Sequence, residues 1–136
     1  MNKDVRWIQR FENLTKAIGR LREALHGIAH DPNNHLYQFA LIGAFQFTFE
    51  LSWKTIKDYL AYNGVEASIP REVIKQAFHH QVIQDGQIWM DMLEDRNLMA
   101  HVYQEQAAVA AGKSIQECYA PAIEKIYHDL LNKQKN

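Results

Sequence analysis

The strongest constraint on the fold of this 136-residue chain is the spacing of apolar residues near its amino terminus. Large apolar side chains recur there at alternating intervals of four and three residues: Trp7, Phe11, Leu14, Ile18, Leu21, Leu25 and Ile28. This period puts all of them on one face of an α-helix, with Arg, Lys and Glu on the other face. We predict one long amphipathic helix, which the turn-forming run Asp31-Pro32-Asn33-Asn34 stops.

A second helix is predicted from about His35 to Tyr62, and Asn63-Gly64 supplies the residues that end it. Its large apolar residues cover more than one face: Leu36, Phe39, Ile42, Phe45, Phe47, Phe49, Trp53, Ile56, Tyr59 and Leu60. One partner helix would leave part of this surface exposed. We therefore expect this helix to be central, or packed on two sides.

A shorter third helix and a longer fourth helix should follow. Ser68 is a candidate cap for a third helix, which has Pro70 in its first turn and runs through Val82 to a break at Asp85-Gly86. The fourth helix is predicted from Gln87 to Gly112.

The run Ser114-Ile115-Gln116-Glu117 has the pattern of a capping box, so a fifth helix should begin there. Pro121 lies deep in that helix and predicts a kink or a later start. The fold class expected is all-α: an antiparallel up-and-down bundle of four to five helices, in one domain over residues 1–136.

Composition restricts the function. A formal net charge of -1 argues against the broad basic surface that holds duplex DNA, so contact with nucleic acid should be local. The only cysteine, Cys118, excludes an internal disulfide and a cysteine metal cluster. The amino terminus has no hydrophobic signal core, and the most apolar run, residues 39–49, is far short of the ~20 residues that cross a bilayer. We expect a cytoplasmic protein without a cofactor or a metal.

Chemically useful side chains gather in residues 94–103. Arg96 offers a permanently charged fork for phosphate oxygens, Asn97 a carboxamide, His101 a proton acceptor near neutral pH, and Tyr103 a modifiable hydroxyl. The spacing of Arg96 and His101 is weak evidence by itself, because Arg20 and His26 stand at a similar separation with no site around them. The second pair differs in its neighbours, which include the acidic residues 94 and 95. This group of residues is suited to handling a phosphodiester.

On one continuous helix, Arg96 and His101 would lie about 140° apart, so a rigid helix could direct both side chains to one point only through the reach of the long arginine side chain. A groove between two copies of the helix would bring Arg96 of one copy to the phosphate approached by His101 of the other. We therefore predict a homodimer with a composite site.

The segment Asp95-Arg96-Asn97-x3-His101-x-Tyr103 resembles the signature of HEPN-domain proteins. In particular it resembles that of the HepT-type toxins, also described as nucleotidyltransferase substrate-binding proteins. The run Phe45-Gln46-Phe47-Thr48-Phe49-Glu50-Leu51-Ser52-Trp53-Lys54 is similar to the family's Phe-Glu-x-x-x-Lys helix, and Trp89 also lies at a position typical of the family. These elements cover most of the chain in the family's order.

The resemblance implies a metal-independent ribonuclease toxin of a type VII-like toxin-antitoxin pair, dimeric and neutralised by a minimal nucleotidyltransferase. Arg96 and His101 match the family's catalytic pair, and Asn97 matches its polar neighbour. Tyr103 matches the tyrosine that receives AMP from the partner. Asp95, Glu50 and Lys54 would support the site.

Simpler interpretations remain open at this stage. Arg96 could be a surface charge beside acidic neighbours, His101 a core or interface histidine, and Tyr103 a packing residue. Glu50 and Lys54 have the spacing of an ordinary ion pair along a helix.

His26 and His30 have the spacing of a helical metal pair, and Asp31 or His35 could join them. The alternative is that both histidines interact favourably with the dipole at a helix C-terminus.

Two functional classes compete: an RNA-cleaving toxin, and a non-catalytic accessory subunit that presents substrate to a nucleotidyltransferase. A proton-transfer group beside a phosphate ligand favours the enzyme, because a binding module does not require one. A purely structural bundle would explain the helices and not residues 94–103.

Overall fold

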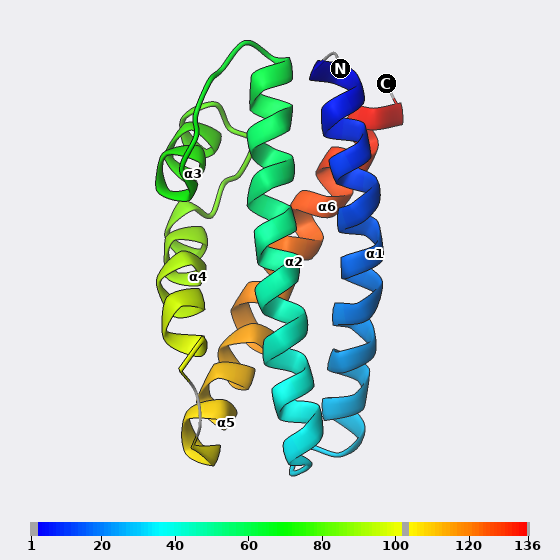
Figure 1. The fold of residues 1–136 in the computed structure, drawn as a ribbon, viewed down its shortest axis with the longest axis vertical. Helices are drawn as coiled ribbons and strands as arrows, with labels where there is room; N and C mark the ends of the chain where they lie inside the picture. Colours follow the sequence, from blue (N-terminus) through cyan, green and yellow to red (C-terminus); the bar gives the residue numbers. More distant parts are fainter. Residues whose placement is uncertain (1–2, 102–103, 136) are drawn as a thin grey trace.

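A computed structural model describes residues 3–101 and 104–135 of the chain, and these residues contain helices and no strand. Helices α1 (Lys3–His30) and α2 (His35–Tyr62) form a long antiparallel pair, and α3 (Pro70–His79) and α4 (Gly86–Met99) lie along α2 on the side away from α1 (Figure 1). Helix α5 (Glu105–Ser114), the π-helix η1 (Ile115–Tyr119) and α6 (Ala120–Lys135) continue one another and cross the pair obliquely. The predicted all-α bundle is confirmed.

The α1–α2 hairpin follows its sequence signals closely. Every residue of the predicted α1 seam is buried except Leu25, which is half-buried. The side chain of Asn34 caps α2 by accepting hydrogen bonds from the backbone N–H groups of Leu36 and Tyr37. After α2, Gly64 has a φ of 85°, a conformation that costs glycine little. The predicted bounds of α2 are confirmed.

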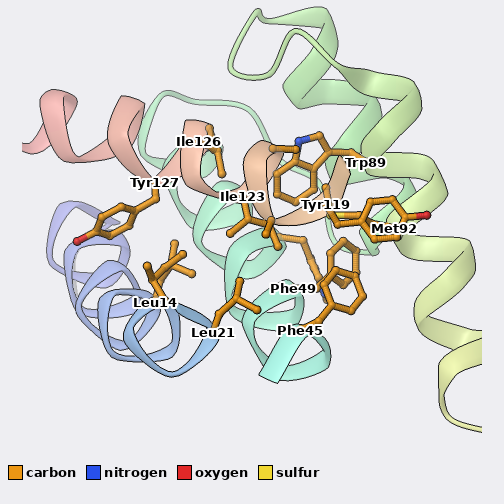
Figure 2. Packing of buried hydrophobic residues seen from close by; sticks show 14 of the residues in the cluster. Leu14, Leu21, Phe45, Phe49, Trp89, Met92, Tyr119, Ile123, Ile126 and Tyr127 are labelled. Atoms are coloured by element: carbon orange, nitrogen blue, oxygen red, sulfur yellow. The ribbon is translucent and has the colours of Figure 1, made fainter. Parts of the chain in front are cut away.

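Helix α2 is the central element, because it contacts every other helix, the π-helix included. Its residues Phe45 and Phe49 are fully buried and pack with Trp89 of α4 and Tyr119 of η1 (Figure 2). On the other side, residues of α1 such as Leu14 and Leu21 meet Ile123 of α6 within the same core. The packing of α2 on two sides, expected from its apolar surplus, is confirmed.

Helix α3 is shorter than predicted. It begins after Ile69, which occupies the cap position without a side-chain hydrogen bond, so the expected Ser68 cap is wrong. It ends at His79, and Val82 lies in the following turn rather than in the helix. That turn contains Gln81 at a φ of 62°, the left-handed conformation that otherwise favours glycine or asparagine. The local sequence gives no sign of this early reversal.

The predicted fourth helix over residues 87–112 is wrong, because the chain leaves α4 after Met99 and starts α5 at Glu105. The cause is tertiary. Met99 and Ala108 are both buried, yet a straight helix would put residues nine apart on opposite faces. Breaking the helix lets both side chains reach the core.

The predicted boundary at Gly112 and Ser114 is also wrong. Gly112 is buried inside the helix and does not end it, and an added Cβ would stand at an ordinary contact distance of 3.7 Å from Leu41 Cδ2. Ser114 has helical backbone angles and makes no capping hydrogen bond. The irregularity expected from Pro121 occurs as the π-helix that precedes it.

Candidate functional site

Arg96 lies in the last turn of α4 and points toward α2. Its Nη1 donates to the Glu50 carboxylate, and its Cζ lies 5.7 Å from the centroid of the Phe49 ring. The side chain is only 23% exposed. The simple alternative of a solvated surface charge is therefore wrong, because the guanidinium is held against a neighbouring helix by an ion pair and an aromatic face.

Glu50 is itself oriented by a second donor. The indole Nε1 of Trp53 donates to Glu50 Oε2 at 3.1 Å, one helical turn along α2. Glu50 therefore pairs with Arg96 rather than with Lys54, which corrects the ion pair expected along α2. The Lys54 Nζ lies 5.9 Å from the centroid of the Trp53 ring instead. Trp53 was missed by sequence reasoning, although its position three residues after Glu50 allows the contact.

Asn97 extends the hydrogen-bonded group toward solvent. Its Oδ1 accepts from Arg96 Nη2 at 3.2 Å, and the residue is exposed. The amide nitrogen of Asn97 is a hydrogen-bond donor, and Asn97 lines the same groove as Arg96.

His101 lies beyond the end of α4, in a turn in which its backbone N–H bonds to Leu98 O at 3.1 Å. The residue is exposed, so it is not a core histidine. On a continuous helix the two side chains would lie about 140° apart, which predicts separate surroundings for them. Arg96 and His101 instead line one open groove on a single protomer.

That groove has a volume of about 610 Å³ and lies between α2 and the end of α4. Its walls are Gln46, Phe47, Glu50, Arg96, Asn97, Ala100 and His101. The structure thus brings together all three residues predicted to be catalytic, and Glu50 with them. Asp95 and Lys54, both named as supporting residues, do not line it.

Asp95 faces a different side of α4, where it accepts a hydrogen bond from the Tyr119 hydroxyl of η1. Sequence reasoning missed Tyr119, since nothing in its neighbourhood marks it as more than an aromatic core residue. Tyr103, the predicted modification site, lies outside the described residues. Its described neighbours, His101 and Gln104, are exposed.

The histidine pair of α1 shows no site. The rings of His26 and His30 lie 4.8 Å apart by their centroids. No group of three or more His, Cys, Asp or Glu side chains in the described part of the chain could hold a metal ion. Within the same residues, no helix is both long and apolar enough to cross a membrane.

The chemistry available in the groove is that of an anion site with a proton acceptor. A phosphate at Arg96 would meet a guanidinium already oriented by Glu50, so little side-chain entropy would be lost when it binds. An imidazole on the same wall could remove a proton from a group next to that phosphate.

Comparisons with known proteins agree with this architecture. The family model described as nucleotidyltransferase substrate binding protein like matches residues 9–132. A crystal structure of a protein from Thermus thermophilus is similar, with a TM-score of 0.77 and 29% sequence identity over 86% of this chain and 98% of that chain. No curated protein matches the sequence. The family match extends over both halves of the bundle and includes every described groove residue, so the chain belongs to the nucleotidyltransferase substrate-binding protein-like family of HEPN-type proteins.

Proposed function

We propose that the protein is a metal-independent HEPN ribonuclease, a toxin that cleaves RNA in the groove between α2 and the end of α4. The observation that carries this proposal is the convergence of Arg96, Asn97 and His101 on one open groove. RNA cleavage by internal transfer is promoted by a proton acceptor and by a fixed cation at the phosphate, and an amide can donate a further hydrogen bond there.

In this mechanism His101 takes the proton of a ribose 2'-hydroxyl while the oxygen attacks the adjacent phosphorus. Arg96 stabilises the negative charge that grows on the phosphoryl oxygens, and Asn97 donates a hydrogen bond to one of them. The bond from phosphorus to the 5'-oxygen breaks, and this oxygen takes a proton from water. The products are a 2',3'-cyclic phosphate and a 5'-hydroxyl end.

Glu50 acts on this reaction through Arg96. The carboxylate and the Phe49 ring hold the guanidinium in one orientation, and Trp53 holds the carboxylate. An arginine fixed before substrate arrives stabilises the transition state better than one that must be ordered during the reaction.

A homodimer remains part of the proposal, on a new basis. Leu36 and Phe47 of α2 are 77% and 44% exposed. With Ala40 and Gly43 between them they form a strip along one face of α2 that runs into the groove at Glu50. Nothing lies within 4 Å of a Cβ built on Gly43, so a second helix can approach closely there. Two such strips facing each other across a two-fold axis would place two grooves side by side.

The proposed regulator is a minimal nucleotidyltransferase, in line with the family's description. It would transfer AMP to Tyr103, two residues from His101. The adenylyl group adds bulk and about one negative charge beside the phosphate position, so it opposes RNA by sterics and by repulsion.

The decisive experiment measures cleavage of single-stranded RNA by the purified chain in EDTA. We expect Arg96→Ala and His101→Ala to lower the rate by about 100-fold or more, since each removes one group that acts on the transition state. Arg20→Ala and His26→Ala are matched controls, because they remove the same residue types from exposed positions on α1. An inactive wild type, or cleavage unaffected by the groove variants, would disprove the ribonuclease.

The alternative is an accessory subunit that only binds substrate for the nucleotidyltransferase. It predicts RNA binding without cleavage and no growth arrest when the chain is expressed alone. Co-expression with the transferase further distinguishes the ribonuclease from the accessory subunit. For the ribonuclease we expect AMP mass increments that disappear in Tyr103→Phe. The Tyr103→Phe variant should also stay toxic in the presence of the transferase.

A further inference from the structure

The π-helix Ile115–Tyr119 has a cause in the sequence. The N–H of Ala120 bonds to Ile115 O, five residues earlier, in place of the usual four. Pro121 follows, and it has no N–H to donate to the Glu117 carbonyl. In a regular α-helix the proline ring would also clash with that carbonyl. The wider turn accommodates the proline. It also changes the side-chain register, so that the adjacent Tyr119 and Ala120 are both buried.

Tyr119 is thereby directed between α2 and α4. Its ring stacks on Phe45 with centroids 5.4 Å apart and planes at 25°, and the residue is 5% exposed (Figure 2). Its hydroxyl donates to Asp95 Oδ2. Burial, the hydrogen bond to Asp95 and the charge of Asp95 together raise the pKa of Tyr119 well above its ordinary value. The hydroxyl therefore stays protonated and remains a donor throughout the physiological range.

Asp95 and Arg96 are consecutive residues that face different neighbours. Asp95 meets η1 and borders a cavity of about 190 Å³ between α4 and α5, while Arg96 meets Glu50 of α2. The last turn of α4 is thus held from two sides by charged hydrogen bonds, which are stronger than neutral ones. His101 follows directly after this turn, so its position depends on how the turn is set.

We infer that Tyr119 is a positioning residue: its hydroxyl, presented by the π-helix, holds Asp95 and so sets the turn from which Arg96 and His101 enter the groove. The effect on cleavage rests on the proposed function, whereas the effect on the position of His101 does not. Tyr119 touches no substrate in this scheme and acts only through Asp95.

The test is Tyr119→Phe, which removes one hydroxyl and keeps the ring stacked on Phe45. We expect the ring resonances of His101 to move in NMR spectra, and kcat for RNA to fall by about 10-fold to 100-fold, with KM within about twofold, as for a small misplacement of a catalytic group. Tyr127→Phe is the matched control, because Tyr127 is another buried tyrosine of the same helical run, stacked on Phe11 and remote from the groove. It should leave both readouts unchanged.

Asp95→Ala removes the acceptor of the same hydrogen bond, and Asp95 is only half-buried. This variant tests the positioning role of Tyr119 if Tyr119→Phe does not fold. If the hydroxyl acts only through Asp95, the double variant loses no more activity than the more affected single variant. Losses that multiply in the double variant would overturn the inference.

The two proposals fail in different ways. A wild-type chain that cleaves no RNA contradicts the ribonuclease but leaves the NMR comparison valid. Unchanged His101 resonances in Tyr119→Phe, or in Asp95→Ala where the tyrosine variant does not fold, overturn the positioning role whether or not the chain cleaves RNA. Equal shifts in Tyr127→Phe would do the same.

Discussion

The α1–α2 hairpin and the α3–α6 half of the molecule are built in different ways. The hairpin consists of two uninterrupted helices of 28 residues, joined by a turn in which Asn34 caps α2. In the other half, α3, α4 and α5 begin without side-chain caps, a turn contains a left-handed Gln81, and a π-helix interrupts the last helical run. Local signals are sufficient to define the first part, whereas tertiary contacts define the second.

The groove lies at the boundary between the hairpin and the α3–α6 half. The hairpin contributes Glu50 and Trp53 from the middle of a rigid helix, and the irregular half contributes Arg96 and His101 from the end of a short one. A regular helix holds an orienting group well, while a helix end allows neighbouring residues to point in directions that a continuous helix forbids.

The largest expected effect tests how much of the stability comes from the hairpin seam. Leu14→Ala should lower the free energy of unfolding by about 2–5 kcal/mol, because Leu14 is fully buried and its loss leaves a cavity. Leu98→Ala, the same change at a residue 65% exposed at the end of α4, should cost less than about 0.5 kcal/mol. Chemical denaturation measures the free energy of unfolding of both variants. Equal losses in the two variants would contradict the larger contribution expected from the buried seam.

The next effect concerns the exposed strip of α2, the part of the hairpin that does not serve its own core. Phe47→Glu should raise the dissociation constant of the proposed homodimer by about 30-fold or more, since it replaces the largest apolar side chain of the strip with a charge. Light scattering against concentration measures it. Ile69→Glu, at a residue 63% exposed outside the strip, is the control. A chain that is monomeric before substitution would refute the dimer.

A smaller effect compares the helix starts. Asn34→Ala should lower the free energy of unfolding by about 1 kcal/mol, because it removes the acceptor for two backbone N–H groups. Asp85→Ala, at the start of α4, should cost only a few tenths, since Asp85 makes no capping hydrogen bond. Thermal and urea unfolding of the two variants would show whether the halves differ as described.

The smallest effect involves an ion pair that joins the halves. Arg22 of α1 donates to both carboxylate oxygens of Glu124 of α6 at 2.7 Å, and these hydrogen bonds lower the pKa of Glu124 despite opposition from burial. Because Arg22 is half exposed, Glu124→Gln should cost no more than about 1 kcal/mol at pH 7.

The sign of its pH dependence follows from the lowered pKa. The contribution of Glu124 is complete above its unfolded pKa, near 4.5, and is lost as pH falls through the lower folded value. The stabilities of wild type and Glu124→Gln should therefore converge in acid. Asp129→Asn, which breaks an exposed pair within α6, should change stability by only about 0.3 kcal/mol at pH 7. A difference for Glu124→Gln that persists in acid would contradict the ion pair as its cause.

Prediction from sequence succeeded where short-range patterns decide the structure. The seam of α1, the bounds of α2 and its central place all follow from apolar spacing and from turn residues such as Asn34 and Gly64. It failed at Met99, where the helix ends without a glycine or proline. The reason is that Met99 and Ala108 must both be buried, and only the assembled core reveals that requirement.

Three of the residues that line the groove were named from the sequence as catalytic, whereas the geometry that brings them together was not predicted. Arg96, Asn97 and His101 were identified from residue type and from resemblance, and the structure brings them to one groove. Their arrangement at the end of α4 could not be derived, because the sequence predicted one continuous helix over residues 87–112. Trp53 and Tyr119 were missed because their roles depend on contacts with Glu50 and Asp95, and an aromatic residue in a core pattern gives no signal of them.

The pairing of Arg96 with Glu50 also affects how the protein would respond to ionic strength. Among the described residues that line the groove, Arg96 is the one with a permanent positive charge, and an adjacent carboxylate offsets it. Each phosphate neutralised on a single strand contributes a slope of about -0.7 to the dependence of log affinity on log salt. If the proposed ribonuclease is correct, added salt should therefore weaken its binding of single-stranded RNA only slightly.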